Sequence, residues 1–80
     1  MFKVYAIQSE KDGRIYVGIT DDIKRRLKEH EAGKTKSTKG YRPWKLVYSE
    51  LIKDRASARD IEKKLKSGFG KEFLKSIVNK

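Results

Sequence analysis

The chain has 80 residues, which is enough for one small domain and leaves no room for a second lobe or a separate cofactor domain. It contains no cysteine, so disulfides, a thiolate zinc site and a cysteine nucleophile are excluded together, and the composition suits a reducing compartment. Lysine and arginine number 21 against 11 acidic residues, which gives a net charge of +10 and favours a polyanionic partner.

The first part of the chain predicts a β-hairpin followed by a helix. Residues 2–8 and 14–20 are rich in Val, Tyr and Ile and predict two strands. Asp12-Gly13 between them indicates a two-residue hairpin loop, because glycine accepts a positive φ freely. Asp21-Asp22 then offers an N-cap for a helix that stops at Gly33.

The second part predicts a loop, a strand and two helices. Residues 33–43 are polar, basic and free of aliphatic side chains, which is typical of a loop, whereas residues 44–52 form a nearly continuous apolar run that predicts a strand. Residues 55–67 predict a helix that Asp54 caps. A last helix is expected over residues 69–78, with an apolar side made of Phe69, Phe73, Leu74 and Ile77.

The predicted order ββαβαα indicates one domain of the α/β (α+β) class over residues 1–80. We expect a three-stranded mixed or antiparallel sheet flanked by three helices. A right-handed crossover after the second strand would carry the chain to the far side of the first, so the expected strand order is 2-1-3.

The positive charge is concentrated in the middle of the chain. Residues 24–45 hold nine basic residues and two acids, and therefore +7 of the net +10. Such a local field is expected of a protein that binds nucleic acid, although a solvated surface would have the same composition. No apolar run approaches the ~20 residues that cross a bilayer, and residues 1–5 lack a signal-peptide pattern. We therefore expect a soluble cytoplasmic protein with no membrane partner.

Charged residues occupy the predicted inner faces of both longer helices. In the first helix the apolar stripe of Ile23 and Leu27 continues through Arg26 and His30 at helical spacing. In the second helix Glu62 falls within the stripe of Ala58, Ile61 and Leu65. A charged group at the edge of a core needs a partner or a function, because its uncompensated burial is costly.

Two tyrosines are predicted to share one face of the sheet. In a hairpin closed by a two-residue loop at Asp12-Gly13, Tyr5 and Tyr16 point to the same side. Gly18 lies on that side as well and would leave space for a closely approaching group.

Each of these residues also has a structural interpretation. Tyr5 and Tyr16 could be ordinary half-buried strand residues, and His30 could be favoured at a helix C-terminus by the dipole. Arg26 could extend its stem along the core toward water, or form a structural salt bridge with Glu62. The convergence of all five residues on inward-facing surfaces favours a functional cluster without excluding these alternatives.

Four segments in order resemble the landmarks of the GIY-YIG nuclease family, and a fifth resembles its third strand. They are Lys3-Val4-Tyr5, Tyr16-Val17-Gly18, Arg26-Leu27-Lys28-Glu29-His30 and Glu62, with the third strand at Pro43-Trp44-Lys45-Leu46-Val47-Tyr48. Each motif is weak alone, whereas all four in order at compatible spacing are specific. Within the family, the chain is similar to short stand-alone bacterial members, akin to the N-terminal domain of the excision-repair nuclease subunit.

The sequence also departs from the family pattern. Lys3-Val4 stands in place of Gly-Ile in the first motif, and Val17 replaces Ile in the second. The family often has an asparagine shortly after its metal-binding glutamate, whereas the only asparagine here is Asn79, which comes later than expected. No role is carried over to it.

The resemblance implies a catalytic apparatus for phosphodiester hydrolysis. Glu62 would hold one Mg²⁺ or Mn²⁺ ion, and Arg26 would contact the scissile phosphate. Tyr5, with Tyr16, would orient or deprotonate the attacking water, which requires a Tyr5 pKa well below its usual ~10. His30 would serve as an acid–base helper or a phosphate donor.

Residues 33–43 would then be a loop that grips the substrate. Its phosphate contacts would come from Lys34, Lys36, Lys39 and Arg42, and Tyr41 could stack on an exposed base. Trp44 is expected to anchor the core. We therefore predict a metal-dependent endonuclease for DNA, including branched or damaged DNA, with structure-directed or weakly sequence-specific cleavage. The alternatives are a non-catalytic nucleic-acid-binding module and a structural protein with an acidic protein partner.

Overall fold

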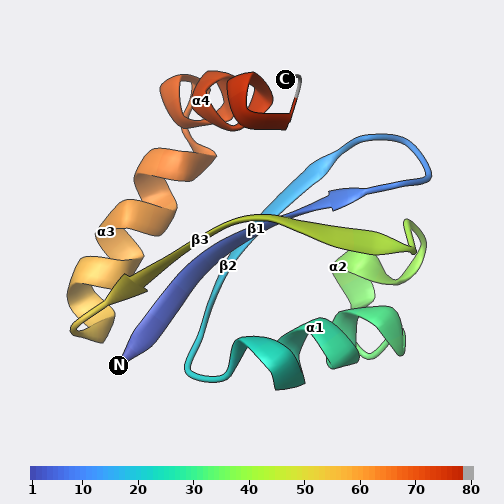
Figure 1. The fold of residues 1–80 in the computed structure, drawn as a ribbon, viewed down its shortest axis with the longest axis horizontal. Coiled ribbons are helices and arrows are strands. Elements are labelled where there is room, and N and C mark those ends of the chain that lie inside the picture. Colours follow the sequence, from blue (N-terminus) through green and yellow to red (C-terminus); the bar gives the residue numbers. More distant parts are fainter. Residues whose placement is uncertain (79–80) are drawn as a thin grey trace.

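The computed structural model describes residues 1–78 as a three-stranded sheet with helices on both faces (Figure 1). The elements are β1 (Phe2–Ser9), β2 (Ile15–Thr20), α1 (Ile23–Glu31), α2 (Lys36–Lys39), β3 (Trp44–Ile52), α3 (Arg55–Lys66) and α4 (Gly68–Val78). Both strand pairings are antiparallel and the sheet order is β2-β1-β3. The predicted α+β class and strand order are confirmed, with β2 and β3 as the outer strands.

The two faces of the sheet have separate apolar clusters, because side chains alternate along each strand. Val4, Ala6 and Val17 pack against α3 and α4. On the opposite face, Tyr5 and Ile7 pack with Trp44 and with residues of α1. Helices α1 and α2 therefore lie on one side of the sheet and α3 and α4 on the other (Figure 1). Within residues 1–78, no helix has the length and apolar character needed to span a membrane.

A short helix replaces part of the loop expected over residues 33–43, so the element order is ββααβαα. Helix α2 begins after Thr35, whose carbonyl oxygen accepts hydrogen bonds from the amides of Thr38 (3.1 Å) and Lys39 (3.0 Å). The sequence Lys-Ser-Thr-Lys has no apolar stripe, so hydrophobic periodicity could not indicate this helix. Its one buried side chain is that of Thr38.

The hairpin loop between β1 and β2 is longer than the two residues expected. Tyr5 pairs with Gly18 and Ile7 with Tyr16, which shifts the register by two residues from that of a two-residue loop. The loop is closed by Ser9, whose amide donates to the carbonyl of Arg14 (2.9 Å) and whose hydroxyl accepts from two loop amides. A shift of two residues preserves the face of every side chain, so Tyr5 and Tyr16 still share one side.

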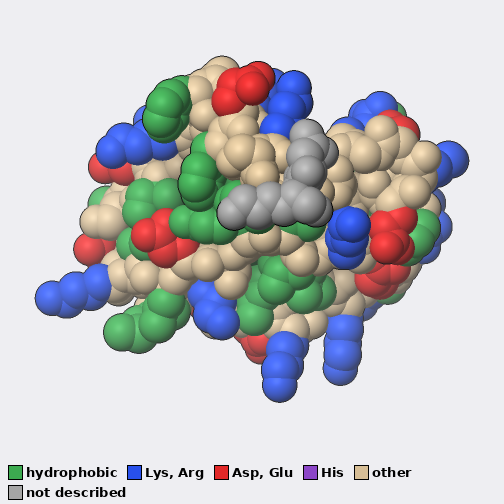
Figure 2. All heavy atoms as spheres, turned by 45° about the horizontal axis from the view of Figure 1, so that its top comes forward, with side chains coloured by type: hydrophobic (Ala, Val, Ile, Leu, Met, Phe, Trp, Pro, Cys, Tyr) green, Lys and Arg blue, Asp and Glu red, His purple; other side chains and the backbone are tan. Residues whose placement is uncertain are grey.

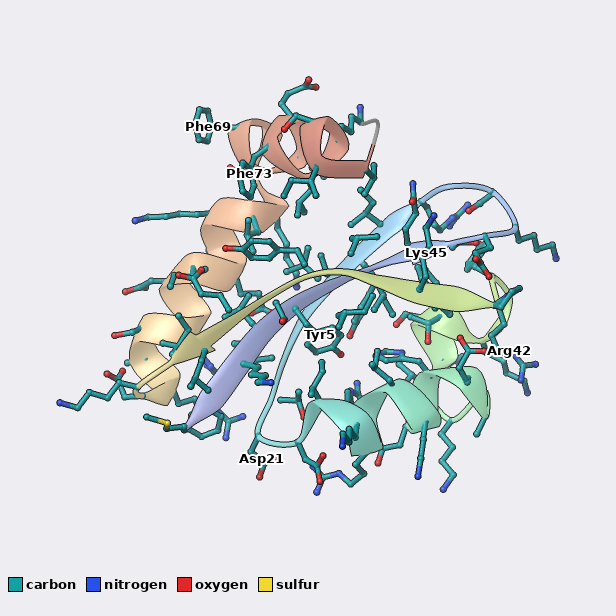
Figure 3. The ribbon with its side chains drawn as sticks, viewed as in Figure 1. Tyr5, Asp21, Arg42, Lys45, Phe69 and Phe73 are labelled. Carbon is teal, nitrogen blue, oxygen red and sulfur yellow. The ribbon has the colours of Figure 1, made fainter. Side chains whose placement is uncertain are left out.

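The expected apolar side of α4 is only partly correct. Leu74 is buried and Ile77 is half-buried, but Phe69 is 87% exposed and points away from the molecule (Figure 3). The reason is the close approach of α3 and α4 at Gly70, where a Cβ would collide with the backbone of Lys64. Gly70 therefore takes the inner position of the first turn. Apolar side chains consequently remain on the outer surface of this region (Figure 2).

Candidate active site

A cleft of about 320 Å³ opens beside the outer strand β2, between α1 and α3. It is lined by four of the residues expected to form the site, Tyr5, Tyr16, Arg26 and Glu62, and by Gly18. These residues come from β1, β2, α1 and α3. The sheet order places β1 next to β2, and the inward-facing sides of α1 and α3 pack on the sheet beside these strands. The fifth residue, His30, is 1% exposed and contacts Tyr5 from behind.

Tyr5 lies at the centre of the site, between the sheet and α1 (Figure 3). Its hydroxyl oxygen is 2.8 Å from Nε2 of His30 and accepts a hydrogen bond from Nε of Arg26 at 3.3 Å. The rings of Tyr16 and His30 meet edge to face, with centroids 5.1 Å apart. Tyr5 itself therefore contacts His30, Arg26 and the ring of Tyr16, whose centroid is 6.4 Å from its own.

Gly18 permits the tyrosine hydroxyl to occupy this position. It pairs directly with Tyr5 across the strands, and a Cβ added to it would lie 2.7 Å from the Tyr5 hydroxyl oxygen. The same Cβ would lie 3.1 Å from Cε1 of Tyr16. Any side chain at position 18 would thus displace both rings, so the space anticipated beside the tyrosines is filled by the tyrosines themselves.

The hydrogen bonds behind Tyr5 have one consistent direction. The Thr38 hydroxyl donates to the carbonyl oxygen of Thr35 at 3.3 Å, and its oxygen lies 2.8 Å from Nδ1 of His30. Because the Thr38 proton is used by Thr35, we assign the proton of the His30 ring to Nδ1, which donates to Thr38. The Nε2 atom of His30 is then an acceptor, and the Tyr5 hydroxyl donates to it.

The ionisation of this pair differs from the expected pattern. Burial lowers the pKa of His30, and the positive charge of Arg26 lowers it further, so the imidazole is neutral at pH 7. Burial raises the pKa of Tyr5 to about 12, and the hydrogen bond from Arg26 only partly offsets this effect. The protein's own groups therefore raise the Tyr5 pKa and do not lower it below 10 as the mechanism requires, because desolvation of the phenolate outweighs the nearby guanidinium.

Arg26 is fixed by its neighbours on α1. Its Nη1 is 2.9 Å from Oε1 of Glu29, and both side chains are about 30% exposed. Glu62 instead pairs with Lys66, one turn along α3, at 3.3 Å. The structural salt bridge considered between Arg26 and Glu62 is thus replaced by two separate pairs, each within one helix.

The family of the chain follows from its similarity to known proteins. Residues 1–75 match the model of the GIY-YIG catalytic domain. The chain belongs to the GIY-YIG family. GIY-YIG proteins form a nuclease superfamily. The matched residues include every residue that lines the cleft.

Relatives of the chain are UPF0213 proteins. It is 44% identical to the UPF0213 protein of Photorhabdus laumondii over 57 residues, which are 70% of this chain and 55% of that protein. It is 36% identical to the UPF0213 protein of Staphylococcus haemolyticus over 75 residues, which are 92% and 90% of the two chains. The chain thus spans about half of the first relative and nearly all of the second.

A solved structure shares the fold. The solution NMR structure of a UPF0213 protein from Bacillus halodurans matches with a TM-score of 0.58 and 36% sequence identity, over 96% of this chain and 85% of that one. The short GIY-YIG fold therefore occurs in a relative whose structure was determined by experiment.

Among the described residues that line the cleft, Glu62 is the acidic one. Its side chain is 23% exposed and shares the cleft with Tyr5 and Tyr16. Within residues 1–78, no group of three or more His, Asp or Glu side chains is placed to hold a metal ion. A lone carboxylate needs waters and substrate oxygens to complete a coordination shell, and this donor set suits Mg²⁺ or Mn²⁺. Asn79 lies outside the described residues.

The residues expected to grip nucleic acid lie away from the cleft, around α2. Lys34, Lys36 and Lys39 are exposed there. Arg42 lies at the opposite end of α1 from Asp21 (Figure 3) and donates to the carbonyl oxygens of Lys39 (3.0 Å) and Glu31 (3.1 Å). Arg42 therefore joins α1 and α2 structurally.

Tyr41 and Trp44 have structural contacts beside α2. The guanidinium of Arg14 lies 3.5 Å from the centroid of the Tyr41 ring, so one face of this ring is already covered. Trp44 is buried, and its Nε1 donates to the carbonyl oxygen of Thr38 at 2.9 Å. Trp44 thus anchors the core, as expected, and supports the helix turn that holds His30.

Three basic residues of the cleft were missed by the sequence analysis. Arg55, Arg59 and Lys63 line it together with Glu62. They follow each other at four-residue spacing on α3 and therefore form one row. The signal in the sequence is the spacing of four residues, which places these side chains on the same side of α3 as Glu62.

Proposed function

We propose that the chain is a metal-dependent endonuclease that hydrolyses phosphodiester bonds in DNA. One observation carries the proposal: Tyr5, Tyr16, Arg26 and Glu62 line a single cleft in a fold of a nuclease superfamily. The cleft combines an oriented phenol, a fixed guanidinium and a carboxylate. These are the groups needed to position water, to balance charge on a phosphate and to hold a hard cation.

Tyr5 and His30 together provide a route for the proton of the attacking water. As the water oxygen bonds to phosphorus and the bond to the leaving oxygen breaks, the water proton passes to the Tyr5 oxygen. The Tyr5 proton passes at the same time to Nε2 of His30, 2.8 Å away. This relay avoids a free phenolate, which the raised pKa of Tyr5 disfavours. The leaving oxygen takes its proton from solvent, and His30 returns its proton through Tyr5.

Arg26 and Glu62 would stabilise the negative charge that develops on the phosphate and the leaving oxygen. Arg26 offers a permanent positive charge whose position is fixed by Glu29 and Tyr5. Glu62 would hold one Mg²⁺ or Mn²⁺ ion, which would polarise the phosphate and stabilise the leaving oxygen. Fixed charge of this kind stabilises a transition state because no reorganisation is needed during the reaction.

The basic row of α3 supports a substrate with a phosphate backbone. Arg55, Arg59 and Lys63 are exposed side chains at the rim of the cleft. Such contacts position a backbone and carry no direct sequence information. We therefore infer structure-directed or weakly sequence-specific cleavage, which suits branched or damaged DNA and a role in repair.

The test is a cleavage screen. Linear, nicked, flapped and branched DNAs are incubated with Mg²⁺, with Mn²⁺ and with a chelator. The proposal requires metal-dependent scission of at least one DNA. Binding without scission of any substrate would contradict it and would favour a nucleic-acid-binding module.

A further inference from the structure

A second hollow lies beside the cleft, between β2 and the pair α3–α4. This groove has a volume of about 590 Å³, which is within the range of small-molecule sites. Its floor is apolar and comes from buried or half-buried side chains of both layers, namely Ile15, Val17, Leu65, Leu74 and Val78. The proposed hydrolysis uses none of these residues.

The rim of the groove is positively charged. Lys66, Lys71 and Lys75 are exposed and line it along α3 and α4, and no acidic residue is among its described lining residues. Lys66 also pairs with Glu62 of the cleft at 3.3 Å. The groove therefore combines an apolar floor with a cationic border that is linked to the catalytic carboxylate.

The groove and the cleft follow the same strand. Tyr16 lines both, and the other lining residues of β2 are Gly18 and Ile19 in the cleft, and Ile15 and Val17 in the groove. The two hollows are therefore neighbours that share the outer strand β2. Tyr16 is the residue that the two linings have in common, so a strand bound in the cleft would need to pass this side chain to reach the groove.

We propose that this groove binds a single-stranded segment of nucleic acid next to the scissile phosphate. The inference rests on the proposed function and specifies its substrate. Sites for single strands combine a positively charged border for the backbone with aromatic side chains on which unpaired bases stack. Here Tyr16 supplies an aromatic ring beside an aliphatic floor that can cover the apolar face of a base. Bases within a duplex are stacked on each other and cannot enter an apolar floor. The groove therefore directs the protein to a junction between duplex and single strand.

The experiment measures affinity for three DNAs by fluorescence anisotropy, with EDTA present so that no DNA is cut. The first is a short duplex, the second carries a single-stranded tail, and the third carries an abasic tail with the same phosphates. We expect the normal tail to improve affinity about tenfold, which corresponds to ~1.4 kcal/mol and lies at the low end of the ~1–3 kcal/mol of a base stacked on an aromatic side chain. The abasic tail should give a smaller gain.

Matched variants test whether the groove is responsible. Lys71→Ala/Lys75→Ala should reduce the gain from both tails, because these side chains would contact the phosphates that the two tails share. Lys24→Ala/Lys28→Ala removes the same charge from exposed positions of α1 and should preserve the gain. The inference is overturned if the tail adds no affinity, if both tails act equally, or if the first double variant keeps the full gain. The proposed function fails in a different way. In that case the tail still improves affinity, but the protein cuts no DNA in the presence of a metal ion.

Discussion

The hydroxyl oxygen of Tyr5 and Nε2 of His30 lie 2.8 Å apart, and neither side chain is more than 1% exposed. This bond joins a residue of β1 to a residue near the end of α1. Thr38 determines its direction by accepting the Nδ1 proton of His30 at 2.8 Å. The one-turn helix α2 is therefore part of the site, although Thr38 does not line the cleft.

Thr38 is a positioning residue, and its hydroxyl should affect catalysis through His30. Thr38→Val leaves Nδ1–H of His30 without an acceptor, so we expect a loss of roughly 10–100-fold in turnover, the size of effect seen for residues that orient metal-ligating histidines. Thr38→Ser keeps the hydroxyl and should restore activity. The ¹⁵N chemical shifts of His30 should report an Nδ1–H tautomer in the wild-type protein. An Nε2–H tautomer would contradict the assigned direction.

Gly18→Ala should disable the site while the fold persists. The added Cβ would lie 2.7 Å from the Tyr5 hydroxyl oxygen, which must then move away from His30. We expect a loss of roughly 10²-fold in turnover, the usual effect of misplacing a catalytic group by about 1 Å. Gly40→Ala is the control, because nothing lies within 4 Å of its Cβ position. Equal activities of the two variants would refute the role given to Gly18.

Arg26 and Arg25 are neighbours that should behave differently. Arg26→Ala removes the charge that contacts Tyr5 and lines the cleft, so turnover should fall by roughly 10²–10³-fold. Arg25 is exposed and pairs with Asp21 at 2.8 Å, so Arg25→Ala should mainly weaken binding of nucleic acid. Steady-state kinetics of the two variants provide the comparison. Equal losses in kcat would mean that the inner face of α1 is wrongly assigned.

The stability of the protein should depend on pH through its single histidine. Burial lowers the pKa of His30 in the folded state, whereas the unfolded chain titrates near its ordinary ~6.5. The unfolded state therefore binds more protons between these values, and the free energy of unfolding should fall as the pH drops below about 6.5. Urea unfolding at several pH values measures this. In His30→Gln the free energy of unfolding should change less with pH below about 6.5. The same pH dependence in the variant and the wild-type protein would contradict the lowered pKa of His30.

Much of the site could be predicted from helical and strand periodicity. Arg26, His30 and Glu62 each interrupt an apolar stripe at helical spacing, so periodicity alone indicates them. The prediction that Tyr5 and Tyr16 lie on one face of the sheet is confirmed, although the predicted hairpin register differs by two residues from the observed one. A shift of two residues leaves each side chain on the same face of the sheet.

Other features depend on contacts that periodicity does not encode. Helix α2 is polar, and Thr38 is buried only because α1 and Trp44 close over it. The raised pKa of Tyr5 follows from its complete burial, which the sequence pattern does not measure. The outward position of Phe69 follows from the close contact of Gly70 with α3. In each case tertiary packing decides the result.

Glu62→Gln provides the most direct test of the central claim, measured as nicking of supercoiled plasmid with Mg²⁺. The variant keeps the size of the side chain and removes the charge that would hold the ion, so nicking should be lost. Its only ion pair among the described residues is with the exposed Lys66, and such pairs contribute ~0–1 kcal/mol, so the melting temperature should change little. Glu72→Gln, which loses a similar pair with Lys75 on α4, is the control and should nick normally. We predict metal-dependent nicking by the wild-type protein and by Glu72→Gln, and none by a folded Glu62→Gln. Full activity of Glu62→Gln, or a wild-type protein that does not nick with any metal, would contradict the account.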